Sequence, residues 1–259
     1  MTDSDAANVE NALLAQMRSV VPLQDWEEVH LRKGPLDEAG GQSIYFPGDA
    51  LISLLASPVG GQAALVGADG CTNWPFGGTA CWEVSVPGTA WRMPHTALQA
   101  ICVQHSAVAG LLESNSAKLV QQVLASLCVV HRSSIPQRVA LWLLNASTLS
   151  RRAHLPVTHQ QLAHLLAVRR SGVTLALHYL EDSGAIRSQR SSTQIWDAAK
   201  LDLVAKRESA VDRNGLAART TSPDRTIGPD ILRAAPIAQM TFSATYKPER
   251  LRRHHRVLG

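Results

Sequence analysis

The sequence predicts an α+β protein with strands in its first third, a long helix in the middle, and short helices followed by a hairpin near residue 200. Short apolar runs alternate with Gly/Pro turn signals from about residue 29 to 98. That punctuation then stops: between residue 96 and Arg132 there is no proline and a single glycine, Gly110. Strand-like segments followed by helix-like segments are typical of the α+β class.

Length and composition indicate a globular protein. The 259 residues suffice for two modest domains, and 45% of them are hydrophobic. No segment approaches the roughly 18–20 consecutive apolar residues of a membrane-spanning helix. The first residues, Met1–Asp5, are acidic and polar, unlike a secretory signal. We therefore expect a cytoplasmic protein with no membrane partner.

Charge is distributed unevenly along the chain. Residues 1–149 contain seven Lys/Arg and twelve Asp/Glu, a net charge of −5. Residues 150–205 contain seven and four, giving +3, and residues 206–259 contain eleven and five, giving +6. A polyanionic partner would therefore meet the C-terminal side of the protein.

The four cysteines, Cys71, Cys81, Cys102 and Cys128, form no C-x-x-C pair. Their spacing matches neither a zinc site nor a disulfide framework. We expect reduced, mostly buried thiols, no metal and no cofactor; a redox or haem-sensing role for one cysteine is the alternative.

The first third is predicted to form an antiparallel sandwich or barrel. Residues 8–30 are expected to be one or two short helices. The apolar runs Ser43–Phe46, Leu51–Ala56 and Ala63–Val66 then alternate with turns such as Pro47-Gly48 and Gly60-Gly61.

A long amphipathic helix is predicted next. Its apolar residues recur at spacings of three, four or seven: Val108, Leu112, Leu119, Val123, Leu127 and Val130. Either the helix packs wholly on its own strand domain, or part of its stripe meets an identical helix. We favour a homodimer through the Val108–Val130 helix. After Pro136, a shorter helix over Gln137–Ala146 is expected to place Val139, Leu141, Trp142 and Leu143 in the core.

Two short helices are predicted within Leu155–Asp197. Thr158 to Gln161 resembles a capping box, in which the Thr158 hydroxyl accepts the Gln161 N–H and the Gln161 side chain reaches back. Ala167-Val168-Arg169 forms a tight turn. The second helix begins near Arg170 and runs to Ser183, before Gly184.

The second helix has two distinct sides. Val173, Ala176, Leu177 and Leu180 share a buried face, so that five other residues point outward: Arg170, Ser171, Thr174, Leu175 and His178. With Ala163 at the crossing and Val168 in the turn, this is the helix-turn-helix pattern. Proteins with this motif place the N-terminal end of the second helix in the major groove of DNA.

A β-hairpin wing follows, formed by Ala185–Ser188 and Thr193–Trp196 around a polar tip. Its arginines, Arg187 and Arg190, are placed to reach phosphates beside the groove. For either arginine alone, a solvated surface charge is as good an explanation as a DNA contact. The predicted DNA-binding residues are Thr158, Arg169, Arg170, Ser171, Thr174, His178, Arg187 and Arg190.

Residues 15–205 resemble the Crp–Fnr superfamily of transcription regulators. The most specific matches are Leu155–Ala163, Leu166–Arg170, Val173-Thr174 and Leu180–Ile186, and weaker ones lie at Ile44–Pro47 with Leu51–Leu55 and at Pro87–Pro94. The resemblance implies an N-terminal antiparallel β-roll of the cyclic-nucleotide-binding type, a long dimerisation helix and a C-terminal winged helix-turn-helix. The corresponding ranges are 1–105, 106–135 and 136–205, and the basic remainder, 206–259, is expected to be disordered.

The resemblance also implies what the protein binds. A homodimer would read double-stranded DNA at a two-fold operator whose half-sites lie about 34 Å apart. Arg170 matches the position that reads guanine through O6 and N7. RNA polymerase is considered as a further partner, and no effector is identified.

Several positions depart from the family. Ala167 stands where many such turns have glycine, and Gly172 where relatives often carry a hydroxyl. Leu175 replaces a polar reader, and we expect it to pack against a neighbour rather than touch a thymine methyl. The Gly-Glu-Leu and Arg-Ser/Ala pattern of cyclic-nucleotide binders is missing, and Glu83 and Arg92 are interpreted as ordinary surface groups.

No enzyme motif is present among H-E-x-x-H, G-x-S-x-G and the phosphate loop, so a non-enzymatic protein is expected. His159, His164 and His178 are interpreted as exposed polar residues of the DNA-facing region. The alternative is a degenerate relative that acts as a protein-interaction or ligand-sensing module without sequence-specific DNA binding.

The missing phosphate and ribose ligands predict that cyclic AMP does not bind tightly. Isothermal titration calorimetry of the full chain with cyclic AMP should give no saturable heat in the micromolar range. A micromolar dissociation constant would refute this prediction.

Overall fold

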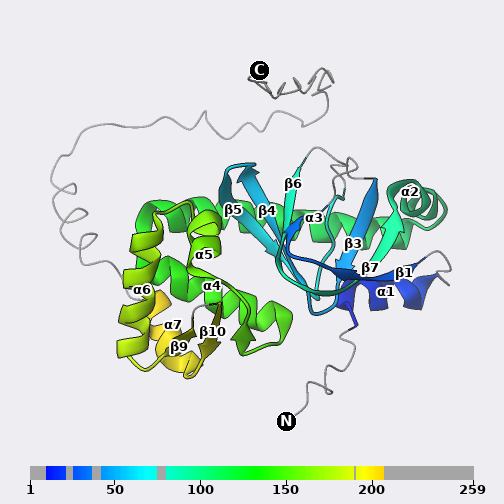
Figure 1. Cartoon of the computed structure of the whole chain (residues 1–259). Helices are drawn as coiled ribbons and strands as arrows, with labels where there is room; N and C mark the ends of the chain where they lie inside the picture. Colours follow the sequence, from blue (N-terminus) through cyan, green and yellow to red (C-terminus); the bar gives the residue numbers. More distant parts are fainter. Residues whose placement is uncertain (1–9, 22–25, 37–41, 75–79, 190, 207–259) are drawn as a thin grey trace, which may run out of the picture. The chain divides into compact units, whose positions relative to one another are not determined.

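The computed structural model describes residues 10–21, 26–36, 42–74, 80–189 and 191–206 (Figure 1). The first part of the chain is mainly strands flanked by short helices: α1 (Ala12–Val20), β1 (Glu27–Leu31), β2 (Gly34–Pro35), β3 (Ser43–Pro47), β4 (Leu51–Ser57), β5 (Gly60–Val66), β6 (Cys81–Val86), β7 (Gly88–Pro94) and α2 (His95–Gln104). The second part is mainly helical: α3 (Ser106–Arg132), α4 (Ile135–Ser150), β8 (His154–Leu155), α5 (His159–Leu166), α6 (Arg170–Asp182), β9 (Ile186–Gln189), β10 (Ser192–Ile195) and α7 (Ala198–Lys206).

The strands of the first part form two antiparallel sheets, in the orders β1-β7-β3 and β2-β6-β4-β5. Tyr45 from the first sheet and Ile52 and Trp82 from the second belong to one buried cluster. Leu119 of α3 joins the same cluster. The predicted antiparallel roll is therefore confirmed, and its interior is filled with side chains.

The buried Asn11 fixes several loops at one end of the roll. Its side-chain oxygen accepts the Leu14 N–H at 3.0 Å and so caps α1. Its amide nitrogen donates to the carbonyl oxygens of Pro47 and Gly70, each at 2.8 Å. One polar side chain thus satisfies backbone groups from three segments.

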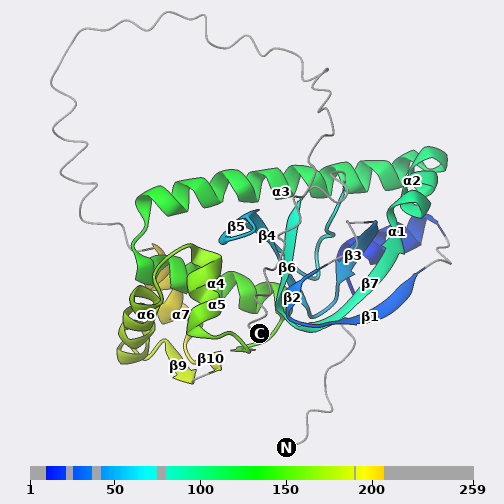
Figure 2. The ribbon, with the colours of Figure 1, turned by 45° about the horizontal axis from the view of Figure 1, so that its top comes forward.

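The predicted long helix is confirmed as α3, which has 27 residues and lies along the strands (Figure 2). Val108, Leu112 and Leu119 are buried against the protein's own strands and helices. Four large apolar residues on the C-terminal half are instead 49–58% exposed: Val120, Leu124, Leu127 and Val130. A water-facing apolar row of this kind is unusual on a helix that packs on one side only.

Two further expectations are wrong. Residues 27–31 form a strand rather than a helix, because they pair with β7 from Glu27 opposite Arg92 to Leu31 opposite Gly88. All four cysteines are free, but only Cys71 is buried; Cys128 is exposed on α3. Cys128 is not one of the residues of the predicted apolar stripe of this helix.

One apolar core joins the second part to the second strand sheet. Leu143 of α4 and Leu177 of α6 share this cluster with Leu51, Leu65 and Val86 of the sheet. Helix α4 begins with a capping box between Ser134 and Gln137 and carries proline in its first turn. The hairpin β9–β10 pairs with β8 in a small antiparallel sheet.

Within the described ranges, no helix combines the length and apolarity needed to cross a membrane.

The turn between α5 and α6 contains a strained alanine. Ala167 follows the last residue of α5 with φ 51° and ψ 48°, the left-handed region that favours glycine. The backbone N–H of Val168 donates to Ala163 and closes the turn. The position therefore tolerates a Cβ, at a cost in conformational energy.

Ala167→Gly is expected to raise the free energy of unfolding by about 0.5–1 kcal/mol, because relief of left-handed strain exceeds the added flexibility of the unfolded chain. Urea denaturation followed by circular dichroism measures the change. The matched control Ala117→Gly, at an exposed position inside α3, should lower it by about 1 kcal/mol. A loss of stability in Ala167→Gly would contradict the role given to this turn.

Candidate DNA interface

Helix α5 begins at Thr158, whose side-chain oxygen accepts the Gln161 N–H at 3.2 Å. The second half of the predicted capping box is wrong. The Gln161 amide instead donates to the Ser85 carbonyl of β6 at 2.7 Å, because α5 packs on the strand sheet. Thr158 is therefore a helix cap at the edge of the motif, and its oxygen is already engaged.

Helix α6 has the two sides that its sequence predicts. Val173, Ala176, Leu177 and Leu180 are all at most 1% exposed and belong to the core shared with α4. Because these four residues fix the rotation of α6, the opposite side must face solvent. Leu175 lies on that side and is 71% exposed, so the expectation that it packs against a neighbour is wrong.

The N-terminal end of α6 presents two cations and a hydroxyl to solvent. Arg169 is the N-cap residue, Arg170 is the first helical residue, and both are exposed together with Ser171. Among the described residues, no carboxylate lies within 4.0 Å of either guanidinium. Free backbone N–H groups at a helix N-terminus add to this positive potential, so that the site is suited to a phosphate or another anion.

His159 connects the first helix, the second helix and the wing. Its Nδ1 lies 3.2 Å from the Thr174 hydroxyl oxygen, and its Nε2 lies 3.4 Å from that of Ser188. Burial lowers the pKa of His159, and the positive charges of Arg170 and His178 lower it further. A lowered pKa favours the neutral imidazole at neutral pH, and the interpretation of His159 as a freely exposed residue is wrong.

The other two outward residues of α6 differ from each other. The Thr174 hydroxyl also donates to the Arg170 carbonyl at 3.1 Å, so it is committed within the motif. His178 is exposed, as expected.

In the wing, the Arg187 guanidinium lies over the Trp196 ring, 3.6 Å from its centroid. Both side chains are exposed, and Trp196 is 58% exposed. Stacking on the indole limits the motion of the guanidinium while leaving its N–H groups available. Arg190 lies outside the described residues.

Trp196 was not selected from the sequence, although its position is informative. It directly follows the second wing strand, and Arg187 lies opposite Gln194 in the hairpin register. Once the hairpin register is known, the sequence indicates that Arg187 and Trp196 lie close together at the base of the hairpin.

Two side-chain pairs involve residues of the strand sheets. His164 Nε2 lies 3.0 Å from Glu83 Oε2, so His164 does not belong to the DNA-facing surface and Glu83 is not an ordinary surface group. Arg92 pairs with Glu27 at 2.5 Å. The contact between His164 and Glu83 is long-range, which explains why sequence spacing did not indicate it.

Gly172 lies close to the first residue of α4. A Cβ at this position would lie 2.9 Å from Cδ1 of Ile135, at the start of α4. The Ile135 side chain would have to shift to accept a larger residue, and the contact that a hydroxyl makes at this position in relatives is absent here.

Within the described ranges, no group of three or more His, Cys, Asp or Glu side chains is placed to hold a metal ion.

Comparisons with known proteins agree with this geometry. Residues 137–204 match the family model of the Crp-like helix-turn-helix domain. A comparison with curated protein sequences finds no match.

Solved structures with a similar fold include FixK2 from Bradyrhizobium japonicum, with a TM-score of 0.58 and 15% identity over 72% of this chain and 100% of that one. A Crp/Fnr-family transcriptional regulator from Thermus thermophilus gives 0.54 and 18% over 71% and 100%. A CooA mutant from Carboxydothermus hydrogenoformans gives 0.52 and 16% over 74% and 95%.

At these identities the solved structures establish the fold, and the family model establishes the domain that the helices and wing form. Residues 137–204 therefore form a Crp-like helix-turn-helix domain, and the chain as a whole has a fold similar to that of Crp/Fnr-family regulators of known structure.

Proposed function

We propose that this protein is a transcription regulator that reads a two-fold DNA operator as a homodimer in the bacterial cytoplasm. The main support for this proposal is the orientation of α6. Four of its apolar residues are buried in the core, and the cations at its N-terminal end face solvent. A helix that presents this end outward can enter the major groove.

Within this proposal the exposed residues have separate roles. Arg170 is placed to read a guanine, since its planar guanidinium can donate two parallel bonds to O6 and N7. Arg169 and Arg187 are assigned to phosphates, which fix the register of the protein on the duplex. Ser171 can contact either a base or a phosphate, and Leu175 can touch a thymine methyl.

Dimerisation through α3 is supported by the exposed apolar row that contains Val120, Leu124 and Leu127. Pairing with the same row of a second copy would remove it from water. Two recognition helices related by a two-fold axis would then meet successive turns of the major groove.

Arg170→Ala is expected to lower the preference for the operator over unrelated DNA by about 1–3 kcal/mol, because the substitution removes a bidentate base contact. A mobility shift with the gene's own upstream region measures both affinities. The control Arg32→Ala removes an exposed arginine of the strand domain and should leave the preference unchanged. Equal loss of specific and non-specific binding would reassign Arg170 to a phosphate.

Salt should weaken DNA binding strongly. With about six phosphate contacts in the complex, the logarithm of the association constant should fall with a slope near −5 against the logarithm of salt concentration. Fluorescence anisotropy over a range of salt concentrations gives the slope. Failure of the protein to bind any duplex at low salt would favour the protein-interaction alternative.

A further inference from the structure

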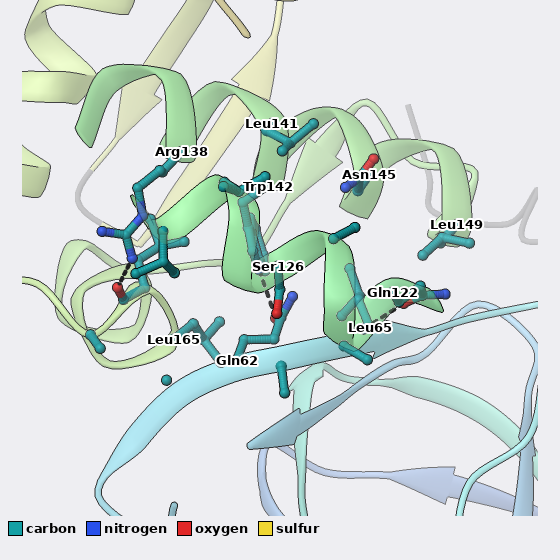
Figure 3. Close-up of a pocket in the computed structure, with 18 of the residues that line it drawn as sticks. Gln62, Leu65, Gln122, Ser126, Arg138, Leu141, Trp142, Asn145, Leu149 and Leu165 are labelled. Carbon is teal, nitrogen blue, oxygen red and sulfur yellow. Dashed lines mark hydrogen bonds between the residues drawn. The ribbon is translucent and has the colours of Figure 1, made fainter. Parts of the chain in front are cut away.

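A cavity of about 470 Å³ lies between β5, the C-terminal half of α3, helix α4 and the end of α5 (Figure 3). Most of its wall is apolar and comes from four elements: Leu65, Val129, Leu141, Trp142, Leu149 and Leu165. This volume lies within the range of small-molecule sites, which are lined by apolar side chains with a few polar groups. Leu141, which was expected in the core, is only partly buried here because it faces this space.

The cavity is separate from the interior of the strand roll. That interior contains the buried residues Tyr45, Ile52 and Trp82, with Leu119 of α3 packed against them. An effector of this protein is therefore more readily accommodated where the strand sheet meets the DNA-binding helices.

Two hydrogen bonds hold the polar part of the wall in place. Trp142 Nε1 donates to Gln62 Oε1 at 2.9 Å and ties α4 to β5. The Leu65 N–H donates to Gln122 Oε1 at 3.1 Å and ties β5 to α3. Because these side chains are already held in place, a ligand does not have to order them when it binds.

Arg138 supplies the positive charge at this cavity. Its guanidinium donates to the Leu166 carbonyl (Figure 3). Burial lowers the pKa of Arg138. Among the described residues, no carboxylate lies within 4.0 Å of it. A partly buried guanidinium that bonds only to a neutral carbonyl has capacity for a bidentate anion.

We propose that this cavity binds a small amphiphilic carboxylate. Its apolar body lies among Leu65, Val129 and Leu141, and its carboxylate pairs with Arg138. A neutral apolar compound would fill the same space without the ion pair, and a strongly polar anion would leave the apolar wall unsatisfied.

The site also adjoins the helix-turn-helix. Leu166 is the last residue of α5 and precedes Ala167, the left-handed residue of the turn into α6. A carboxylate on Arg138 would share the guanidinium with the Leu166 carbonyl, so that ligand binding and the position of the turn are linked. This part of the proposal rests on the proposed DNA-binding function.

Calorimetry of the full chain with octanoate and with octan-1-ol tests the site without DNA. Wild type should bind octanoate saturably, and Arg138→Met should weaken octanoate about tenfold or more while leaving octan-1-ol unchanged. The matched control Arg32→Met removes an exposed arginine that does not line the cavity and should change neither affinity. No saturable octanoate binding by wild type, or equal affinity in Arg138→Met, would overturn the proposal.

A second variant covers the case in which Arg138→Met fails to fold. Ala125 lines the cavity from an exposed position on α3, so Ala125→Phe should fill the space without removing charge or a buried residue. Loss of both ligands in this variant supports the cavity as the site. Retention of octanoate binding places the ligand elsewhere and overturns the proposal.

The link to DNA is measured as operator affinity with and without octanoate. Wild type should change affinity about threefold or more, and Arg138→Met should not respond. Octanoate binding with no change in DNA affinity would overturn the proposed link to DNA binding, whereas the proposed binding site would stand. Absence of DNA binding by wild type would count against the proposed function, and the calorimetric result would stand independently.

Discussion

The orientation of α6 depends on one packing constraint. Val173, Ala176, Leu177 and Leu180 fill the core that α4 also occupies, and burying four apolar side chains stabilises the fold by several kcal/mol. Turning the helix would expose these residues and bury the guanidinium groups of Arg169 and Arg170, each of which carries a large desolvation penalty. Both effects hold the cations in solvent.

The same core determines how the motif is supported. Leu51, Leu65 and Val86 of the strand sheet belong to it, so the helix-turn-helix and the roll are packed together in this structure. Polar contacts follow that packing: Gln161 donates to Ser85, and His164 pairs with Glu83. A signal that changes the strand sheet can therefore reach α5 through direct contacts.

Local patterns in the sequence predicted the elements well, and long-range contacts account for what it missed. The apolar spacing of α6, the left-handed turn position and the strand punctuation each depend on neighbouring residues. The strand at Glu27–Leu31 depends on its pairing with the distant strand β7. The role of Gln161 depends on a partner 76 residues away in the sequence, and that of Glu83 on a partner 81 residues away. His159 was misjudged because its partners, Thr174 and Ser188, lie on two other elements.

Chemical modification of arginines tests the central claim most directly. Phenylglyoxal labelling, read by mass spectrometry, compares each arginine in free protein and in the complex with upstream DNA. The orientation of α6 predicts that Arg169 and Arg170 react in the free protein and are protected by DNA, while Arg32 reacts equally in both. Equal labelling of Arg170 with and without bound DNA, or no labelling of it in the free protein, would contradict the account.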